Sequence, residues 1–366
     1  MVHFRSSALA VAAAVFSLIG SAAASPLPLE ERLNNFLAAR KSPVAKRATV
    51  PDAPHFVVYS DKYSSTEPAI ADINGFNVFA LAFLEQYGAA DDAQVWAAFT
   101  DDQRKQIVDS YHAAGISLIV SAFGSTENPT SSSYDPVATA DTIAAWVTKY
   151  GVDGVDVDYE DFTAFNKGDG SAETWLINFT KELRAKLPQG QYILTHAPVA
   201  PWFSPAPKWG GGGYLKVNQE VGDMIDWYNV QFYNQGTSEY ADCDGLLTKS
   251  TSAWPQSSLF EIVASGVDQD KLVIGKPGTA TDANNGVIAP ATLATCVSQA
   301  HAKGWNAGVM SWQYPDAGSA WITTVRGDTW PVAPAPSGSA SSTSASATSS
   351  APASTASAAP APFPTA

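Results

Sequence analysis

The chain has 366 residues, with 21 Lys and Arg against 35 Asp and Glu, and a formal net charge of −14 at pH 7. Residues 48–332 hold 15 of the basic and 33 of the acidic side chains, together with all 11 Trp residues. Binding to a phosphate backbone or an anionic membrane depends on Lys and Arg surfaces, so we expect no nucleic-acid and no membrane partner. The aromatic and aliphatic content of this segment excludes disorder there, because it is high enough to build a large core.

The first 47 residues have the pattern of a secretory leader. Residues 1–24 combine a short polar start, an apolar stretch over 8–19 and the small residues Ala22-Ala23-Ala24, as in a signal peptide. The apolar stretch is too short to span a bilayer. Residues 25–47 end in the dibasic pair Lys46-Arg47 and are predicted to be a propeptide. We therefore expect a secreted, extracellular protein.

Residues 333–366 form a segment of different composition. They consist almost entirely of Ser, Ala, Thr and Pro and carry no charge. Such a segment cannot bury enough apolar surface to offset its ordering entropy, so we predict a disordered, O-glycosylated tail. A tail of this kind is compatible with association of the protein with a cell wall.

Secretion gives a context to two further features. In an oxidising compartment Cys243 and Cys296 are predicted to form a disulfide, with two free buried thiols as the alternative. Asn178 begins the sequence Asn-Phe-Thr, which is the pattern of an N-glycosylation site.

Eight short runs rich in Val, Ile, Phe or Tyr predict strands, in chain order His55–Tyr59, Phe76–Phe83, Ile116–Phe123, Val152–Tyr159, Tyr192–Ala197, Trp227–Phe232, Lys271–Gly275 and Ala307–Trp312. Helical patterns between them include Asp101–Ala114, Pro136–Tyr150, Ala172–Lys186 and Pro290–Lys303. Eight strands alternating with helices over residues 48–332 match an α/β fold of the single-domain (β/α)8 TIM barrel type. The alternative is a doubly wound open sheet, which often has a Gly-rich phosphate turn that is missing here.

In such a barrel the side chains at the carboxyl ends of the strands line the active site. Here those ends hold rings and polar groups, namely Tyr59, Phe83, Ser121, Asp158, Glu160, Gln231, Tyr233 and Trp312. Aromatic rings stack on the C–H faces of a sugar, and carboxylates accept hydrogen bonds from its hydroxyls. The strand ends therefore predict carbohydrate binding.

The fourth predicted strand alternates acidic and apolar residues. Because a strand has a two-residue period, Asp156, Asp158 and Glu160 share one face, with about 6.5–7 Å between successive side chains. Three carboxyl groups this close in a poorly hydrated site cannot all ionise cheaply, so we expect at least one to hold a proton at neutral pH. A retained proton is what a general acid needs.

A metal site is the main alternative for these acids. An EF-hand loop that began at Asp156 would require Gly at its sixth position and Glu at its twelfth, where this chain has Asp161 and Lys167. No His-rich ligand set accompanies the acids. We therefore predict a catalytic strand, with no metal and no cofactor.

The same strand resembles the signature of a known family. Asp153-Gly-Val-Asp-Val-Asp-Tyr-Glu160 is similar to the D-G-x-D-x-D-x-E motif of glycoside hydrolase family 18, the chitinases and their relatives. Three further segments resemble the second, sixth and eighth strands of plant-type and compact fungal members, namely Ala80–Leu84, Val230–Asn234 and Met310–Trp312. One departure is Phe123, in Ser-Ala-Phe-Gly124, where the family has glycine; it leaves open how a substrate fits near this strand.

The resemblance implies retaining, substrate-assisted cleavage of a β-1,4 bond after N-acetylglucosamine. Glu160 is then the general acid and base, Asp158 orients the acetamido group, and Asp156 shares a proton beneath it. The acetamido oxygen of the substrate acts as the nucleophile.

The resemblance also implies the surroundings of the acids. Tyr233 would bond the acetamido oxygen with Gln231 and Asn234 nearby, and Trp312 would form the floor under the sugar. Without the acidic motif, Tyr233 and Gln231 are interpreted as caps of a strand and Trp312 as a core residue. Trp202 and Trp209 either stack on outer sugars or pack their own Gly/Pro-rich loop.

Only about thirty residues separate Gly275 from the eighth predicted strand, a normal crossover length. Family members with deep clefts carry an α+β insertion at this point. We predict no such insertion here and expect a shallow, open groove suited to internal cleavage.

We favour a monomeric endo-acting chitinase. An endo-β-N-acetylglucosaminidase that cuts the chitobiose core of N-glycans is the alternative, followed by a non-catalytic sugar-binding relative and a wall protein.

Overall fold

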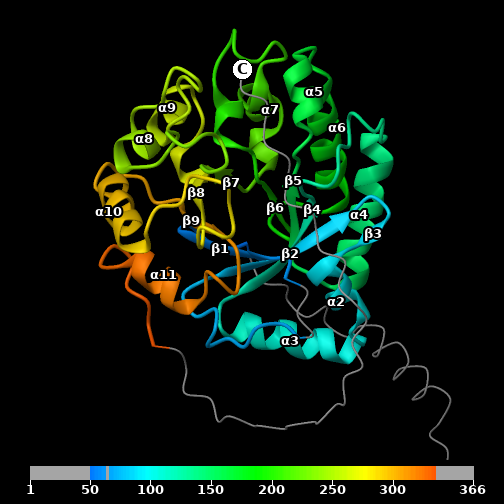
Figure 1. Ribbon diagram of the computed structural model, residues 1–366. Coiled ribbons are helices and arrows are strands. Elements are labelled where there is room, and N and C mark those ends of the chain that lie inside the picture. Colours follow the sequence, from blue (N-terminus) through cyan, green and yellow to red (C-terminus); the bar gives the residue numbers. More distant parts are fainter. Residues whose placement is uncertain (1–49, 63–65, 335–366) are drawn as a thin grey trace, which may run out of the picture. The chain divides into compact units, whose positions relative to one another are not determined.

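The computed structural model describes residues 50–62 and 66–334, all within residues 47–366, the second of the two units into which the chain divides. Its sheet has parallel strands β1 (His55–Ser60), β2 (Val78–Glu85), β4 (Ser117–Phe123), β5 (Gly154–Asp158), β6 (Ile193–His196), β7 (Trp227–Gln231), β8 (Leu272–Pro277) and β9 (Gly308–Trp312). The sheet closes because β1 pairs with both β2 and β9. The predicted barrel is confirmed (Figure 1). The leader, the propeptide and residues 335–366 of the tail lie outside the described residues.

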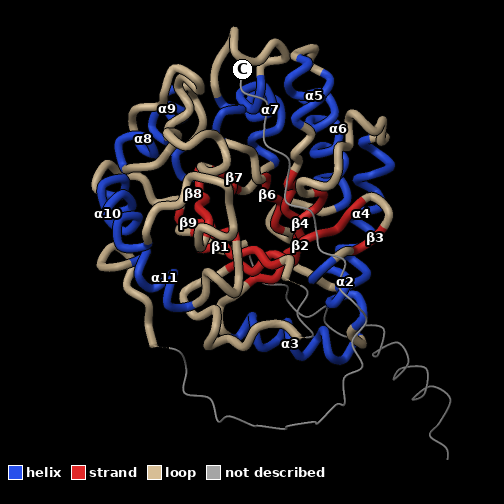
Figure 2. Tube along the Cα trace, viewed as in Figure 1, coloured by secondary structure: helices blue, strands red, loops and turns tan. Residues whose placement is uncertain are grey.

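Helices surround the barrel, as Figure 2 shows. They are α2 (Asp91–Ala98), α3 (Asp101–Ala113), α4 (Pro136–Tyr150), α5 (Phe162–Lys167), α6 (Ser171–Lys186), α7 (Gly213–Val221), α8 (Cys243–Leu247), α9 (Leu259–Ala264), α10 (Pro290–His301) and α11 (Ser319–Arg326). Helix α3 begins with a capping box between Thr100 and Gln103. Helix α4 begins at Pro136 after the capping side chain of Asp135 and ends at Tyr150, before Gly151 in the left-handed conformation. All four predicted helices are present, with bounds within two residues of the expected ones.

The core lies inside the barrel and between the strands and the helices. Every residue of β5 is buried, so its apolar and acidic residues occupy opposite sides of a fully covered strand. Gly154 is required at the start of β5, because a Cβ atom there would lie 2.1 Å from the carbonyl oxygen of Ile193 on β6. Residues 278–307, which join β8 to β9, contain the single helix α10 and no α+β insertion.

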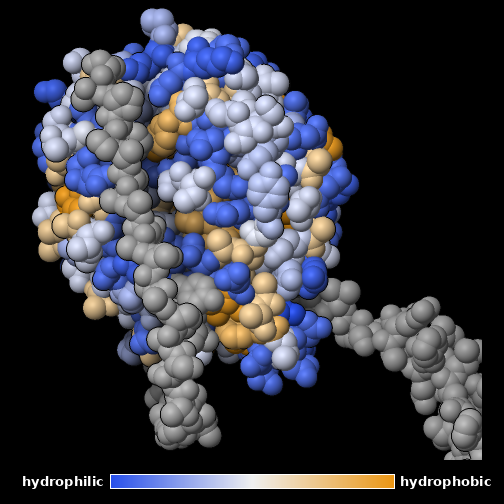
Figure 3. Space-filling model, turned by 45° about the vertical axis from the view of Figure 1, so that its right-hand side comes forward, coloured by the Kyte–Doolittle hydropathy of each residue, from blue (hydrophilic) through white to orange (hydrophobic). Residues whose placement is uncertain are grey.

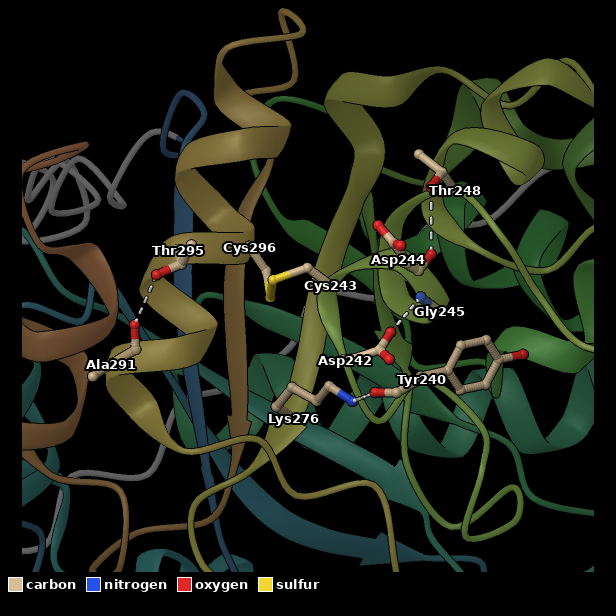
Figure 4. The surroundings of a disulfide bond; sticks show 10 residues. All are labelled: Tyr240, Asp242, Cys243, Asp244, Gly245, Thr248, Lys276, Ala291, Thr295 and Cys296. Atoms are coloured by element: carbon tan, nitrogen blue, oxygen red, sulfur yellow. Dashed lines mark hydrogen bonds between the residues drawn. A yellow bond between two sulfur atoms is a disulfide. The ribbon is translucent and has the colours of Figure 1, made fainter.

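The predicted disulfide is confirmed. Cys243, the first residue of α8, is bonded to Cys296 in α10 (Figure 4).

Asn178 is exposed on α6, whereas Thr180 of the same sequence pattern is buried, and glycosylation of Asn178 stays a prediction. Over residues 50–62 and 66–334, no helix has the length and apolar character needed to cross a membrane.

Candidate active site

Asp156 lies inside the barrel and is surrounded by hydrogen-bond donors from three neighbouring strands. Ser121 Oγ on β4 donates to Asp156 Oδ2 at 2.9 Å. Thr195 Oγ1 on β6 and Asn229 Nδ2 on β7 donate to Asp156 Oδ1 at 2.5 and 3.1 Å. Burial raises the pKa of Asp156, and these donors oppose the shift because they stabilise the ionised form.

Asp158 and Glu160 form the next layer, towards the mouth of the barrel. Gln231 Nε2 donates to Asp158 Oδ1 at 2.9 Å and to Glu160 Oε1 at 3.3 Å. Burial raises the pKa of Asp158 well above its ordinary value, and the adjacent carboxyls of Glu160 and Asp156 raise it further. Burial also raises the pKa of Glu160. The arrangement therefore favours retention of a proton between the two carboxyls, the condition for general acid chemistry.

Tyr233 lies two residues beyond Gln231 and is buried beside the same acids. Burial raises the pKa of its hydroxyl well above 10.0, and the nearby carboxyls of Asp158 and Glu160 add to the shift. The phenol is thus a neutral hydrogen-bond donor across the ordinary pH range. Asn234 Oδ1 accepts a hydrogen bond from the backbone N–H of Asn284 at 2.8 Å and so braces the loop after β8. Contact between Asn234 and the substrate stays a prediction.

An aromatic pair borders the site. The rings of Phe83 on β2 and Trp312 on β9 stack with centroids 5.7 Å apart, and both side chains are only half-buried. Gly124 is needed beneath Phe83, because a Cβ atom there would lie 2.9 Å from that ring. The pair offers an apolar surface of the kind on which a sugar ring stacks.

Tyr59 lies deeper than a residue of the mouth. Its ring is 6.0 Å from that of Trp312, but its side chain is buried and its hydroxyl accepts from Asn229 Nδ2 at 2.9 Å. Tyr59 supports the network around Asp156, and its hydroxyl bonds that carboxyl as well. Direct contact between Tyr59 and the substrate stays a prediction.

Phe123, the departure from the family motif, does not enter the mouth. Its backbone has a φ of 80° and its side chain is fully buried. The ring packs against α6, with centroids 5.7 Å from Trp175 and 5.4 Å from Phe179. The phenylalanine thus fills space between the barrel and α6.

The prediction that Trp202 stacks on an outer sugar is wrong. Its side chain is 1% exposed and stacks on Phe165 of α5 at 3.9 Å and on Tyr214 of α7 at 6.0 Å. Trp209 is also buried and donates its Nε1–H to the carbonyl oxygen of Pro201 at 2.7 Å. Both residues pack their own loop.

Sequence reasoning missed Thr195 and Asn229. Both belong to strands it had located, and Thr195 is the register partner of Asp156 in the pairing of β5 with β6. Alignment of the predicted strands side by side would have pointed to Thr195, since parallel neighbours in register share a face. The described ranges contain no group of three or more His, Cys, Asp or Glu side chains arranged to hold a metal ion.

Comparison with known proteins agrees with this geometry. Residues 55–346 match the family described as Glycosyl hydrolases family 18. A chitinase of Enterococcus faecalis is 26% identical over 263 residues, which cover 66% of this chain and 72% of that protein. Endochitinase 3 of Metarhizium anisopliae is 28% identical over 167 residues, which cover 44% of this chain and 47% of that protein.

Solved structures share the barrel. A GH18 chitinase from Pseudoalteromonas aurantia is 27% identical, with a TM-score of 0.62, and the match covers 74% of this chain and 98% of that one. A fungal endo-β-N-acetylglucosaminidase of family 18 shares the fold at 21% identity and a TM-score of 0.54, over 75% of this chain and 98% of that one. With its acidic strand in a closed eight-stranded barrel and a family match over most of its length, the chain belongs to glycosyl hydrolases family 18 and is a glycosidase of that family.

Proposed function

We propose that this glycosidase is a secreted, endo-acting chitinase that cleaves β-1,4 bonds after N-acetylglucosamine with retention of configuration. The observation that supports it most is the pair of Asp158 and Glu160, linked by Gln231, beside Tyr233 and above the buried Asp156. The two relatives named as chitinases support the choice of substrate.

In this mechanism Glu160 donates its proton to the glycosidic oxygen as the bond to the anomeric carbon breaks. The acetamido oxygen of the substrate attacks the same carbon and forms an oxazolinium ion. Asp158 accepts a hydrogen bond from the acetamido N–H and stabilises the positive charge, while Tyr233 donates to the acetamido oxygen. Water then attacks the anomeric carbon, the bond between this carbon and the acetamido oxygen breaks, and the water gives a proton to Glu160, which restores the acid.

Asp156 allows Asp158 to change its charge during this cycle. Ser121, Thr195 and Asn229 supply donors to Asp156, and burial keeps all of these groups from water. A proton shared between Asp156 and Asp158 moves towards Asp156 as Asp158 takes up its contact with the acetamido group. The stacked Phe83 and Trp312 hold the apolar face of the sugar during these steps.

The test is Glu160→Gln, with Glu220→Gln as a matched control because Glu220 lies on the surface of α7 and pairs with Lys216. On chitotetraose we expect Glu160→Gln to lose at least about a thousandfold in kcat and to retain oligosaccharide binding, whereas Glu220→Gln keeps the wild-type rate. Near-normal turnover by Glu160→Gln would exclude the mechanism. Release of an intact glycan from a high-mannose glycoprotein, with chitotetraose left uncut, would establish the endo-β-N-acetylglucosaminidase instead.

Secretion rests on the leader pattern of residues 1–47. N-terminal sequencing of the protein recovered from culture medium is expected to begin at Ala48, after cleavage at Lys46-Arg47. A mature protein that begins at Ser25 would show that the propeptide is retained, and a protein found only inside the cell would exclude secretion.

A further inference from the structure

Strand β2 continues past the barrel into a small hairpin that presents one aromatic ring to solvent. After Glu85 the chain turns at Gln86 and Tyr87 and returns as the antiparallel strand β3 (Gly88–Ala89). In Figure 1 this hairpin projects from the barrel towards α4. Tyr87 is 89% exposed, and across the described ranges it is the most exposed of the large hydrophobic side chains. Figure 3 shows one face of the molecule, on which hydrophilic residues predominate.

The hairpin is fixed to the loop between β4 and α4. Glu127, itself buried, accepts a hydrogen bond from the backbone N–H of Gln86 at 2.9 Å. Thr126 Oγ1 donates to Glu85 Oε1 at 2.9 Å. Since both contacts come from a loop anchored at the barrel rim, the turn that carries Tyr87 is held in place before any ligand arrives.

A second ring completes the surface. Tyr134, in the same loop, packs edge to face against Tyr87 with centroids 6.1 Å apart and an interplanar angle of 82°. Its hydroxyl donates to Glu127 Oε1 at 3.3 Å, and its carbonyl oxygen accepts from Trp175 Nε1 at 2.8 Å. A preorganised aromatic pair loses little conformational freedom on binding, which favours its use as a contact surface.

The pair lies at the edge of the catalytic face. Tyr87 lies in the turn after β2, four residues beyond Phe83, which borders the catalytic site; four residues of extended chain span at most about 13 Å. Tyr134 follows β4, and β4 is the neighbour of β5, which carries the acids. A saccharide that passes over Phe83 and Trp312 reaches this rim only if it extends beyond the sugars at the cleaved bond.

We propose that Tyr87 and Tyr134 form an outer sugar-binding platform that stacks on a β-1,4-linked N-acetylglucosamine chain away from the cleaved bond. The proposal rests on the proposed chitinase function. Two rings beside the half-buried carboxyl group of Glu85 match a pyranose, which has an apolar C–H face and hydrogen-bond donors at its rim.

The test compares short and long substrates in Tyr87→Ala, with Tyr150→Ala as a matched control. Tyr150 is a partly exposed tyrosine at the opposite end of α4. For chitohexaose we expect Tyr87→Ala to raise KM about 3- to 10-fold with kcat unchanged, because one stacking contact is lost. For chitotriose, kcat/KM stays at the wild-type value, and Tyr87→Trp restores the KM for chitohexaose. Tyr150→Ala behaves as the wild type on both substrates.

Two outcomes would overturn the platform: an unchanged KM for chitohexaose, or an equal loss on both substrates. A wild-type chain that leaves chitotriose and chitohexaose uncut would refute the chitinase proposal but not the platform. In that event the platform is tested by binding to insoluble chitin. The fraction of protein bound is compared between Glu160→Gln and the double variant that carries Glu160→Gln and Tyr87→Ala. Equal retention of the two would overturn the platform, and weaker retention of the double variant would support it.

Discussion

The side-chain amide of Gln231 donates from one nitrogen to two carboxyl groups, at 2.9 Å to Asp158 and 3.3 Å to Glu160. A residue of β7 thus connects the two acids of the β5 segment and holds them at a fixed separation. Its amide lowers the pKa of both groups, opposing the effect of burial.

We expect Gln231→Leu to remove this restraint. Without the donor, the pKa values of both carboxyls rise, so both limbs of the kcat/KM–pH profile on chitotetraose move to higher pH. Misplacement of the acids lowers kcat by about 10- to 100-fold. Gln189→Leu is the control, because Gln189 is exposed and only bonds the carbonyl oxygen of Asp223. A wild-type pH profile for Gln231→Leu would show that the amide does not set these pKa values.

The acids could be placed from the sequence because a strand has a two-residue period, which puts Asp156 and Asp158 on one side of β5. The donors to Asp156 could not be placed so easily. Thr195 and Asn229 lie on other strands, and their proximity follows from strand register, which a single run of residues does not reveal. Local periodicity therefore predicts which residues share one face of a strand, but it does not predict the hydrogen bonds that join Asp156 to neighbouring strands.

The aromatic residues show the same limit. Exposure of a ring in a Gly/Pro-rich loop depends on what packs over it, and Trp202 is covered by Phe165 and Tyr214 from two different helices. Phe123 likewise turns outwards because its backbone adopts a positive φ next to Gly124. Neither the burial of Trp202 nor the outward orientation of Phe123 can be predicted from local composition.

The motif residue Asp153, just before β5, supports a prediction about pH and stability. His112 of α3 contacts both carboxyl oxygens of Asp153, at 2.9 and 3.0 Å, and this hydrogen bond raises the pKa of His112 above 6.5. The folded state thus binds the proton more tightly than the unfolded chain. The hydrogen bond between His112 and Asp153 therefore adds about 1 kcal/mol to the free energy of unfolding below pH 6.5. This contribution is lost as the pH rises through the folded-state pKa of His112.

Urea unfolding of the wild type and His112→Gln at several pH values measures this effect. We expect the free energy of unfolding to differ more between the two proteins at pH 5.5 than at pH 8.5. His301→Gln, at an exposed position of α10, serves as the control for loss of an imidazole that does not contact Asp153. A difference that grows with pH would contradict the predicted direction.

The disulfide joins residues 53 apart in the sequence and should limit the freedom of the unfolded chain. The loop-entropy relation gives about 4 kcal/mol for a loop of this length. We expect the variant with Cys243→Ser and Cys296→Ser to unfold at a lower urea concentration, with activity on chitotetraose near the wild-type value at 25 °C. Equal midpoints for the variant and the oxidised wild type would refute a stabilising role.

Lys276 of β8 links three loop segments near the site. It is fully buried, and its Nζ donates to the carbonyl oxygens of Phe232, Tyr240 and Gly286 at 2.6, 2.7 and 2.9 Å; the bond to Tyr240 is drawn in Figure 4. Phe232 directly precedes Tyr233. Gly286 lies so close that a Cβ atom there would be 2.6 Å from the Cα of Tyr233. The lysine therefore positions Tyr233 in two ways: it holds the backbone of Phe232, the preceding residue, and the backbone of Gly286, which packs against Tyr233.

We expect Lys276→Met to leave these carbonyls without their donor and to destabilise the fold by about 3 kcal/mol. Lys271→Met is the matched control, because Lys271 precedes β8 at its other end and donates to the carbonyl oxygens of Gly222 and Ile225, both at 2.8 Å. Both variants should unfold at lower urea concentration than the wild type. Only Lys276→Met should also raise KM and lower kcat on chitotetraose at a temperature where both remain folded, since only that lysine contacts the segments around Tyr233. Equal KM and kcat values for the two variants would show that Lys276 contributes to stability and does not position Tyr233.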